Sequence, residues 1–306
     1  MRVAKVPGSK WRLAREIVAR LPRRRVYVEP FFGSGAVLMA KPRWPSELIN
    51  DIDSRVVALF RVLRDRPDEL ARAVSLTPFS REEWDEVRSA SADGDDGESG
   101  GDLEVARRFL VESWMTHGNN STGAHGWRHD GPNGRRGKSV AQEWASLPAK
   151  IERVADRFMG VMIECRPALD VIDRYQGNDV TVLADPPYLA DSVHGRRRKI
   201  YRHEMLEADD HAPLLNLLIQ HRGPVVACSY RNDLYDGLLL GAGWDVVEFR
   251  AHAEHGAERV EALYMNRVAV ADTPRQLTME PTSDPRLRID AQGDDRPLPG
   301  PERVTT

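Results

Sequence analysis

The hydrophobic positions of the chain fall into short apolar runs that alternate with stretches in which apolar residues recur at helical spacing. Runs rich in β-branched and apolar residues favour strands, and the 3.6-residue period favours amphipathic helices. We expect strands at 26–28, 47–53, 161–164, 180–184, 224–229, 244–250 and 263–270. We expect helices at 13–21, 36–40, 56–63, 65–88, 105–115, 144–158, 168–172, 214–219 and 234–240. This alternation predicts an α/β fold with a doubly wound, mostly parallel sheet, closed by an antiparallel pair of late strands.

The same pattern divides the chain into parts. Strand–helix alternation at 1–60 resumes at 161–271, so these two stretches predict one domain with an inserted helical lobe at 61–160. Within the lobe, 89–102 loses all hydrophobicity, and we interpret it as a flexible acidic loop that is too polar to pack. Residues 272–306 are rich in Pro, Asp and Arg without periodicity and predict a disordered tail.

Composition narrows the class of protein. The 306 residues are 41% hydrophobic, enough for a sizeable core, and the net charge is −3. Two cysteines are too few for a disulfide framework or a four-cysteine zinc site. The N-terminus leads into Pro7-Gly8 and not into an apolar run, so we expect no signal peptide, no membrane span and a cytoplasmic protein.

The stretch from Val180 to Tyr188 carries the most specific chemistry. Its apolar strand must end at Asp185-Pro186-Pro187-Tyr188, because prolines cannot donate to a sheet ladder. A carboxylate, rigid backbone carbonyls and an aromatic ring are thereby presented at the carboxyl end of a strand, where open α/β sheets bind ligands.

Three further features suit a nucleotide-like ligand. Phe31, Gly33 and Gly35 lie in a turn between a strand and a helix, although two glycines alone are weak evidence. Asp51 ends the next strand and is a candidate for binding ribose hydroxyls, whereas Asp53 or Ser54 better suits a helix N-cap. Lys10 stands at a turn with a donor that can reach a ligand, or it is an ordinary solvated lysine.

Two basic stretches favour contact with a polyanion. The first follows Gly118-Asn119-Asn120 in a long irregular region, and the second comes shortly after Tyr188. Each could instead be a solvated surface, and the histidines among them lack metal-ligand spacing. The candidate DNA-binding residues are Arg128, Arg135, Arg136, Lys138, Arg196, Arg197, Lys199 and Arg202, with Trp127 as a stacking residue.

The ordered set of motifs resembles the Dam-like, D12-class adenine-specific DNA methyltransferases over residues 4–268. The motifs are Pro7-Gly8-Ser9-Lys10, Glu29-Pro30-Phe31-Phe32-Gly33-Ser34-Gly35, Asp51, Asp185-Pro186-Pro187-Tyr188, Lys199 to Met205, Asp210-His211, Arg259, Glu261-Ala262-Leu263 and Asn266. Each motif alone is moderately specific, but the ordered set is highly specific. The resemblance implies a Rossmann-like fold that uses S-adenosylmethionine, a target-recognition role for 61–160, duplex DNA as partner, and no metal.

The same resemblance implies roles for the candidate residues. Lys10, Phe31, Gly33, Gly35 and Asp51 would hold S-adenosylmethionine, with Asp51 on its ribose and Asp185 near its methionine end. Asp185 and the Pro186 carbonyl would orient the N6 amine of a flipped adenine, Pro187 would add rigidity, and Tyr188 would stack on the base.

The chain departs from the family pattern at two positions, and three alternatives stay open. Relatives usually have an aromatic residue at the position of Val6 and often an acid near Pro167, for which backbone groups or Glu164 could substitute. The alternatives are an RNA adenine methyltransferase, an inactive DNA-binding relative, and, disfavoured by the short glycine turn, a dinucleotide oxidoreductase. The sequence leaves open the target site, the oligomeric state (with a monomer as one option), a restriction-modification partner and the host, whether bacterium or phage-infected cell.

Overall fold

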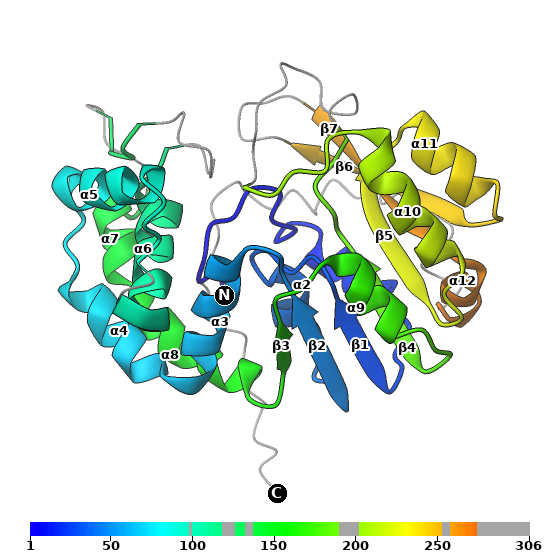
Figure 1. Cartoon of the computed structure of the whole chain (residues 1–306), viewed down its shortest axis with the longest axis horizontal. Coiled ribbons are helices and arrows are strands. Elements are labelled where there is room, and N and C mark those ends of the chain that lie inside the picture. The colour runs from blue at the N-terminus through cyan, green and yellow to red at the C-terminus, as the bar shows by residue number, and fades with distance from the viewer. Residues whose placement is uncertain (98–99, 118–125, 132–136, 190–201, 253–257, 274–306) are drawn as a thin grey trace, which may run out of the picture.

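The computed structural model describes residues 1–97, 100–117, 126–131, 137–189, 202–252 and 258–273. Within these ranges the chain forms a seven-stranded sheet in the order β3-β2-β1-β4-β5-β7-β6 (Figure 1). The strands are β1 (Val26–Glu29), β2 (Ser46–Asn50), β3 (Met162–Glu164), β4 (Val180–Ala184), β5 (Val225–Tyr230), β6 (Asp245–His252) and β7 (Glu258–Met265).

The strand order makes the sheet doubly wound. Strands β1 to β5 are mutually parallel, and the β6–β7 hairpin pairs antiparallel to β5. The order reverses between β1 and β4, and ligands of open α/β sheets bind beyond the carboxyl ends of the strands at such a switch point. The predicted Rossmann-like, mostly parallel sheet with an antiparallel closing pair is confirmed.

Helices cover both faces of this sheet (Figure 1). Successive strand residues point to opposite faces, so Tyr27, Ile49 and Leu183 belong to one hydrophobic cluster, whereas Val28 and Leu48 belong to the other. The helices are α1 (Ala14–Ala19), α2 (Ala36–Ala40), α3 (Ser54–Asp65), α4 (Pro67–Leu76), α5 (Arg81–Ala92), α6 (Gly101–Met115), α7 (Val140–Ala145), α8 (Leu147–Phe158), α9 (Ala168–Arg174), α10 (Ala208–Ile219), α11 (Asp233–Tyr235), the π-helix η3 (Asp236–Leu240) and α12 (Arg267–Asp272). Helices α1, α2, α3 and α8 pack on the first cluster and α9 and α10 on the second.

Several predicted elements are wrong in extent. The strand expected at 47–53 ends at Asn50, and the helix expected at 214–219 begins earlier, at Ala208. Three others differ for a local reason. The helix expected at 65–88 is two helices, because Ser80 caps the start of α5 after Pro78. The helix at 144–158 is also two, since α8 begins at Leu147 with a proline in its first turn. The strand expected at 263–270 ends at Met265, because the Asn266 side chain accepts the Ala269 N–H and caps α12.

The loop predicted at 89–102 is shorter among the described residues, and part of it packs. Helix α5 extends to Ala92, and α6 begins at Gly101. The Asp96 side chain is only 9% exposed and accepts a hydrogen bond from Ser91 Oγ at 3.2 Å. Arginines pair with its charge, and paired acids can be buried where unpaired ones cannot.

Helices α4 to α8 gather into a separate group beside the β3 edge of the sheet (Figure 1). Helix α3 packs against α6 and α8 and so joins this group to the sheet. It spans the proposed domain boundary at residue 61. At the other proposed boundary, Asp272 ends α12, and residues 274–306 lie outside the described part of the chain.

Candidate active site

The segment Asp185-Pro186-Pro187-Tyr188 follows directly on β4, whose five residues are all buried. Because β4 pairs in parallel with β1 and β5, Asp185 stands at the carboxyl edge of the sheet between two neighbouring strands. Its side chain is 19% exposed, and Pro186 is buried. The strand thus delivers a carboxylate to the edge where the sheet order reverses.

Lys10 neutralises this carboxylate. Its Nζ lies 2.9 Å from Asp185 Oδ1 and donates to the Gly8 carbonyl at 3.0 Å, and the lysine side chain is only 7% exposed. Burial raises the pKa of Asp185, and the Lys10 ammonium opposes that rise. Lys10 is therefore a buried partner of Asp185, and the solvated-lysine reading is excluded.

Tyr188 is held at its hydroxyl and at its ring. The hydroxyl donates to Glu261 Oε2 at 2.6 Å and lies 3.5 Å from Asp185 Oδ1. The ring meets the edge of Tyr230, with 4.7 Å between centroids, and the Lys10 ammonium lies 4.7 Å from the Tyr188 centroid. Lys10, Asp185 and Tyr188 therefore form one contiguous cluster.

A cavity of about 680 Å³ opens beside this cluster. That volume falls within the roughly 300–1,000 Å³ of small-molecule sites. The walls come from the turn at 5–10, the loop after β1, the carboxyl end of β2, helices α5 and α6, the turn at 167–169, and residues 202–205. Asp185 and Pro187 are among the described residues that line the cavity, whereas Pro186 and Tyr188 are not.

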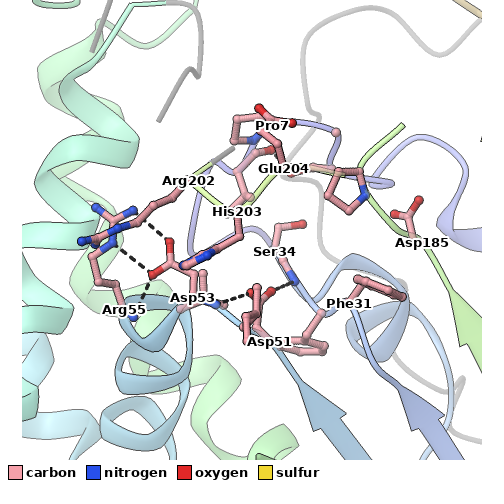
Figure 2. Close-up of a pocket in the computed structure, with 18 of the residues that line it drawn as sticks. Pro7, Phe31, Ser34, Asp51, Asp53, Arg55, Asp185, Arg202, His203 and Glu204 are labelled. Atoms are coloured by element: carbon pink, nitrogen blue, oxygen red, sulfur yellow. Dashed lines mark hydrogen bonds and ion pairs between the residues drawn. The ribbon is translucent and has the colours of Figure 1, made fainter. Parts of the chain in front are cut away.

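Asp51 lines the cavity away from Asp185 (Figure 2). Backbone N–H groups fix both of its oxygens: Gly33 N donates to Oδ2 at 2.8 Å, and Asp53 N donates to Oδ1 at 2.9 Å. Burial raises the pKa of Asp51 to about 6, against the lowering effect of these hydrogen bonds. Each carboxylate oxygen has a second lone pair, so Asp51 can still accept hydrogen bonds from a ligand.

The two glycines of the turn serve different purposes. Gly33 (φ +51°) lines the cavity and brings its N–H to Asp51. Gly35 (φ +70°) caps α2 and does not line the cavity in the described structure; a Cβ there would lie 2.6 Å from Phe32 Cζ. Phe31 lines the cavity as well. Gly35 therefore shapes the turn from behind.

Sequence reasoning missed Asn50 and Glu29. The buried Asn50 amide donates to the carbonyls of Pro30 and Arg166 at 2.9 and 3.0 Å, and its Oδ1 accepts the Arg166 N–H at 2.9 Å. Asn50 thereby joins the loops after β1 and β3. Its position at the end of a strand, beside Asp51, was the sequence signal that could have identified it. Glu29 lines the cavity, and burial raises its pKa to about 8.

A buried charge network connects Asp51 to the helical group. The Asp53 side chain accepts the Arg55 backbone N–H at 3.0 Å and caps α3, which confirms the capping interpretation. It also pairs with the Arg55 guanidinium at 2.8 and 3.1 Å. Arg55 also lies 3.1 Å from Glu112 on α6 and 3.8 Å from Asp96. Arg202 pairs with Asp96 from the opposite wall, where Figure 2 shows Arg202 and His203 facing Asp53 and Asp51. Spacing along the chain gave no sign of this network.

The proposed DNA-binding residues are in different environments. Arg128 pairs with Glu143 at 3.0 Å and is 17% exposed, whereas Lys138 is exposed. Trp127 packs against Phe79 and His129, with centroids 5.9 and 5.7 Å away. Arg202 contributes to the charge network and lines the cavity. Arg135, Arg136, Arg196, Arg197 and Lys199 lie outside the described residues.

The two departures from the family pattern both fall on the cavity wall. Val6 and Pro167 line the cavity. Glu164 faces Arg166 and Arg174, at 3.7 and 3.8 Å, and is not among the described lining residues. Glu164 therefore does not substitute for an acid near position 167 in this conformation.

Among the described residues, no three His, Cys, Asp or Glu side chains gather in a group that could hold a metal ion. None of the helices in the same ranges combines the length and apolar character needed to cross a membrane.

Together, the doubly wound sheet, the cavity at its switch point and the partly buried acid after β4 define an α/β protein with a nucleotide-type site. The chain belongs to the D12 class N6 adenine-specific DNA methyltransferase family, whose model matches residues 7–248. This confirms the family resemblance and supports methyl transfer as the class of activity.

Solved structures are similar only at low identity. Precorrin 8W decarboxylase from Methanobacterium thermoautotrophicum has 10% identity and a TM-score of 0.34, with 86% of this chain and 94% of that one covered. The SAM dependent methyltransferase from Agrobacterium tumefaciens has 14% identity and a TM-score of 0.35, with 83% and 59% covered. No curated protein matches the sequence. The fold assignment rests on the strand order of this chain, because these TM-scores are low.

Proposed function

We propose that this protein transfers a methyl group from S-adenosylmethionine to the N6 amine of an adenine flipped out of duplex DNA. The observation that carries the proposal is the Lys10–Asp185 pair beside Tyr188, on a cavity that Asp51 and Gly33 also line. Family membership supplies the reaction class.

The cavity residues fit S-adenosylmethionine. Asp51 keeps acceptor sites for ribose hydroxyls, and the glycine turn and Phe31 allow close approach of a ligand. Lys10 and Asp185 would contact the methionine end. When bound, the cofactor supplies an electrophilic methyl group on its sulfonium sulfur.

The chain's own task is to prepare the adenine amine. Its lone pair is delocalised into the ring, so the amine is a poor nucleophile. Asp185 and the Pro186 carbonyl accept hydrogen bonds from the two N–H groups of the amine. These hydrogen bonds turn the nitrogen lone pair toward the methyl carbon. Tyr188 holds the base by stacking, and Pro187 keeps the segment rigid. With the cofactor bound, the transfer would form a bond from this nitrogen to the methyl carbon while the carbon–sulfur bond breaks and its electron pair goes to sulfur.

The amine must then lose a proton. Burial raises the pKa of Asp185, which makes its carboxylate a stronger base than a surface aspartate. Asp185 is thus the group in this cluster suited to receive that proton before solvent removes it.

Target recognition belongs to the proposed lobe at 61–160, built mainly from α4 to α8. These helices stand beside the β3 edge, and their charge network reaches the cavity. Exposed Lys138 is suited to phosphate contact. We keep Arg128, which also pairs with Glu143, and Arg135, Arg136, Arg196, Arg197 and Lys199 as proposed DNA contacts. Arg202 is a further candidate, and its pair with Asp96 favours a role inside the charge network.

Transfer of tritium from labelled S-adenosylmethionine to duplex DNA or to RNA tests this function. We expect label in DNA at N6 of adenine, and we expect Asp185→Ala to lower kcat by roughly 100-fold or more. Asp245→Asn, at the exposed start of β6, is the matched control and should retain activity. Label found only in RNA, or full activity of Asp185→Ala, would overturn the proposal.

A further inference from the structure

Glu261 lies beside the proposed catalytic cluster without touching the cavity. It is on β7, with its backbone paired to Tyr230 of β5 on one side and to Phe249 of β6 on the other. It is not among the described residues that line the cavity. Two strands therefore hold its position, and its side chain hydrogen-bonds to the proposed catalytic cluster at the Tyr188 hydroxyl.

The Tyr188 hydroxyl has two carboxylates within reach but only one hydrogen to donate. Glu261 Oε2 is 2.6 Å from the hydroxyl oxygen, and Asp185 Oδ1 is 3.5 Å away. Hydrogen bonds between oxygen atoms have distances near 2.7 Å and weaken steeply beyond 3 Å. These distances indicate that the Tyr188 hydroxyl donates its hydrogen to Glu261.

Because the Tyr188 hydroxyl donates to Glu261, an acceptor site on Asp185 stays open. Lys10 already donates to Oδ1, the same oxygen that the Tyr188 hydroxyl would reach. A hydroxyl turned toward Asp185 would occupy an acceptor site that an incoming amine needs, and it would stabilise the charge of a carboxylate that must take up a proton.

We propose that Glu261 is a positioning residue for methyl transfer: it holds the Tyr188 hydroxyl away from Asp185, so that Asp185 stays available to the substrate amine. The inference rests on the proposed function and assigns Glu261 no direct contact with substrate. Tyr230, whose ring edge meets Tyr188, completes the support of the ring.

The charge of Glu261 adds a second effect. Burial and the Glu261 charge raise the pKa of Asp185, whereas Lys10 and the Tyr188 hydroxyl lower it. Removing the Glu261 charge should therefore move the acid limb of the kcat–pH profile to lower pH. The other charged or titratable groups around the cluster are Glu29 on β1, Cys228 and Tyr230 on β5, and Tyr235 on α11.

Substitutions separate this role from a merely structural one. Glu261→Ala should lower kcat roughly 10- to 100-fold and leave the affinity for S-adenosylhomocysteine within about twofold. Glu261→Gln keeps an amide oxygen that can accept a hydrogen bond from the Tyr188 hydroxyl, so its kcat should stay within roughly fivefold of the wild-type value. The acid limb of its kcat–pH profile should lie at lower pH, because the charge is removed.

The decisive measurement is the double variant. Tyr188→Phe removes the hydroxyl that competes for Asp185, so adding it to Glu261→Ala should raise kcat above that of Glu261→Ala alone. A double variant no more active than Glu261→Ala would overturn the proposal. Glu248→Ala, on neighbouring β6 in an exposed pair with Arg231, is the control for removing an acid from this hairpin.

A readout without turnover separates this inference from the proposed function. With 3-fluorotyrosine at position 188, the ¹⁹F resonance should shift in Glu261→Ala and much less in Glu261→Gln. An unchanged resonance in both variants would rule out the contact. A wild-type protein inactive on DNA and RNA would instead overturn the proposed function, while the resonance still reports on the contact.

Discussion

Asp51 and Asp185 line the same cavity, but the chain holds them in different ways. Both are partly buried carboxylates with a raised pKa. Backbone N–H groups fix Asp51, from Gly33 and Asp53, whereas Asp185 pairs with the Lys10 side chain. Behind Asp51 stands a network of alternating charges, and behind Asp185 stand a tyrosine and one further acid.

The difference matches what each carboxylate has to do. A backbone amide keeps its place throughout a reaction, so it suits an acid that only binds a ligand. A side-chain ammonium or hydroxyl can change partner, which suits an acid that must accept substrate hydrogens and then a proton. We expect substitutions at the Asp51 end to change cofactor affinity, and those at the Asp185 end to change kcat.

The largest expected contrast comes from Asp51→Asn. Hydrogen bonds to a charged acceptor contribute about 1.5–3 kcal/mol each, so the Kd of S-adenosylhomocysteine should rise roughly 10- to 100-fold. In saturating cofactor, kcat should fall less than about threefold. Calorimetry and initial rates measure the two quantities, with Asp68→Asn on α4 as control. A fall in kcat as large as the loss of affinity would contradict the division between the two ends.

The pH dependence sharpens the same test. With a pKa of about 6, Asp51 is ionised and fully able to accept hydrogen bonds above that pH, so wild-type affinity should fall as pH drops through 6. Asp51→Asn should lose this dependence. Because the folded-state pKa is raised, Asp51 also makes a contribution to stability that is present below its unfolded pKa and lost as pH rises toward 6.

A smaller effect is expected behind the glycine turn. Gly35→Ala places a Cβ 2.6 Å from Phe32 Cζ at a φ of +70°, so we expect a loss of about 1–3 kcal/mol in the free energy of unfolding. Gly237→Ala in η3 meets open space and should change stability by less than about 1 kcal/mol. Denaturant unfolding measures both. Equal stabilities would show that the turn tolerates a side chain.

The smallest expected effects are those of substitutions at Arg202 and Lys138, which should change cofactor affinity and the salt dependence of DNA affinity, respectively. Arg202→Ala leaves the nearly buried Asp96 with less compensating charge and should weaken cofactor binding about two- to fivefold, without changing how DNA affinity depends on salt. Lys138→Ala should reduce the log–log salt slope by about 1 and leave cofactor binding intact. A reduced salt slope in Arg202→Ala would instead restore Arg202 as a phosphate contact.

Local patterns predicted the sheet and the motifs because they depend on neighbouring residues. The apolar run at 180–184 had to stop at Pro186, and the carboxyl ends of parallel strands had to share an edge. Helix boundaries were less predictable where a single cap or proline divides a continuous apolar pattern, as at Ser80, Leu147 and Asn266. A strong period shows that a helix is present and says little about where it ends.

By itself, the sequence determined the doubly wound sheet, the acid after β4 and the acid after β2, since each follows from the order of residues along the chain. Only the tertiary structure decided which groups hold those acids. Glu261 lies 73 residues from Tyr188 along the chain, and Asp96 lies 106 from Arg202. A hydrogen bond depends on distance in space, and spacing in sequence carries no trace of such partners until the sheet and the helices have packed.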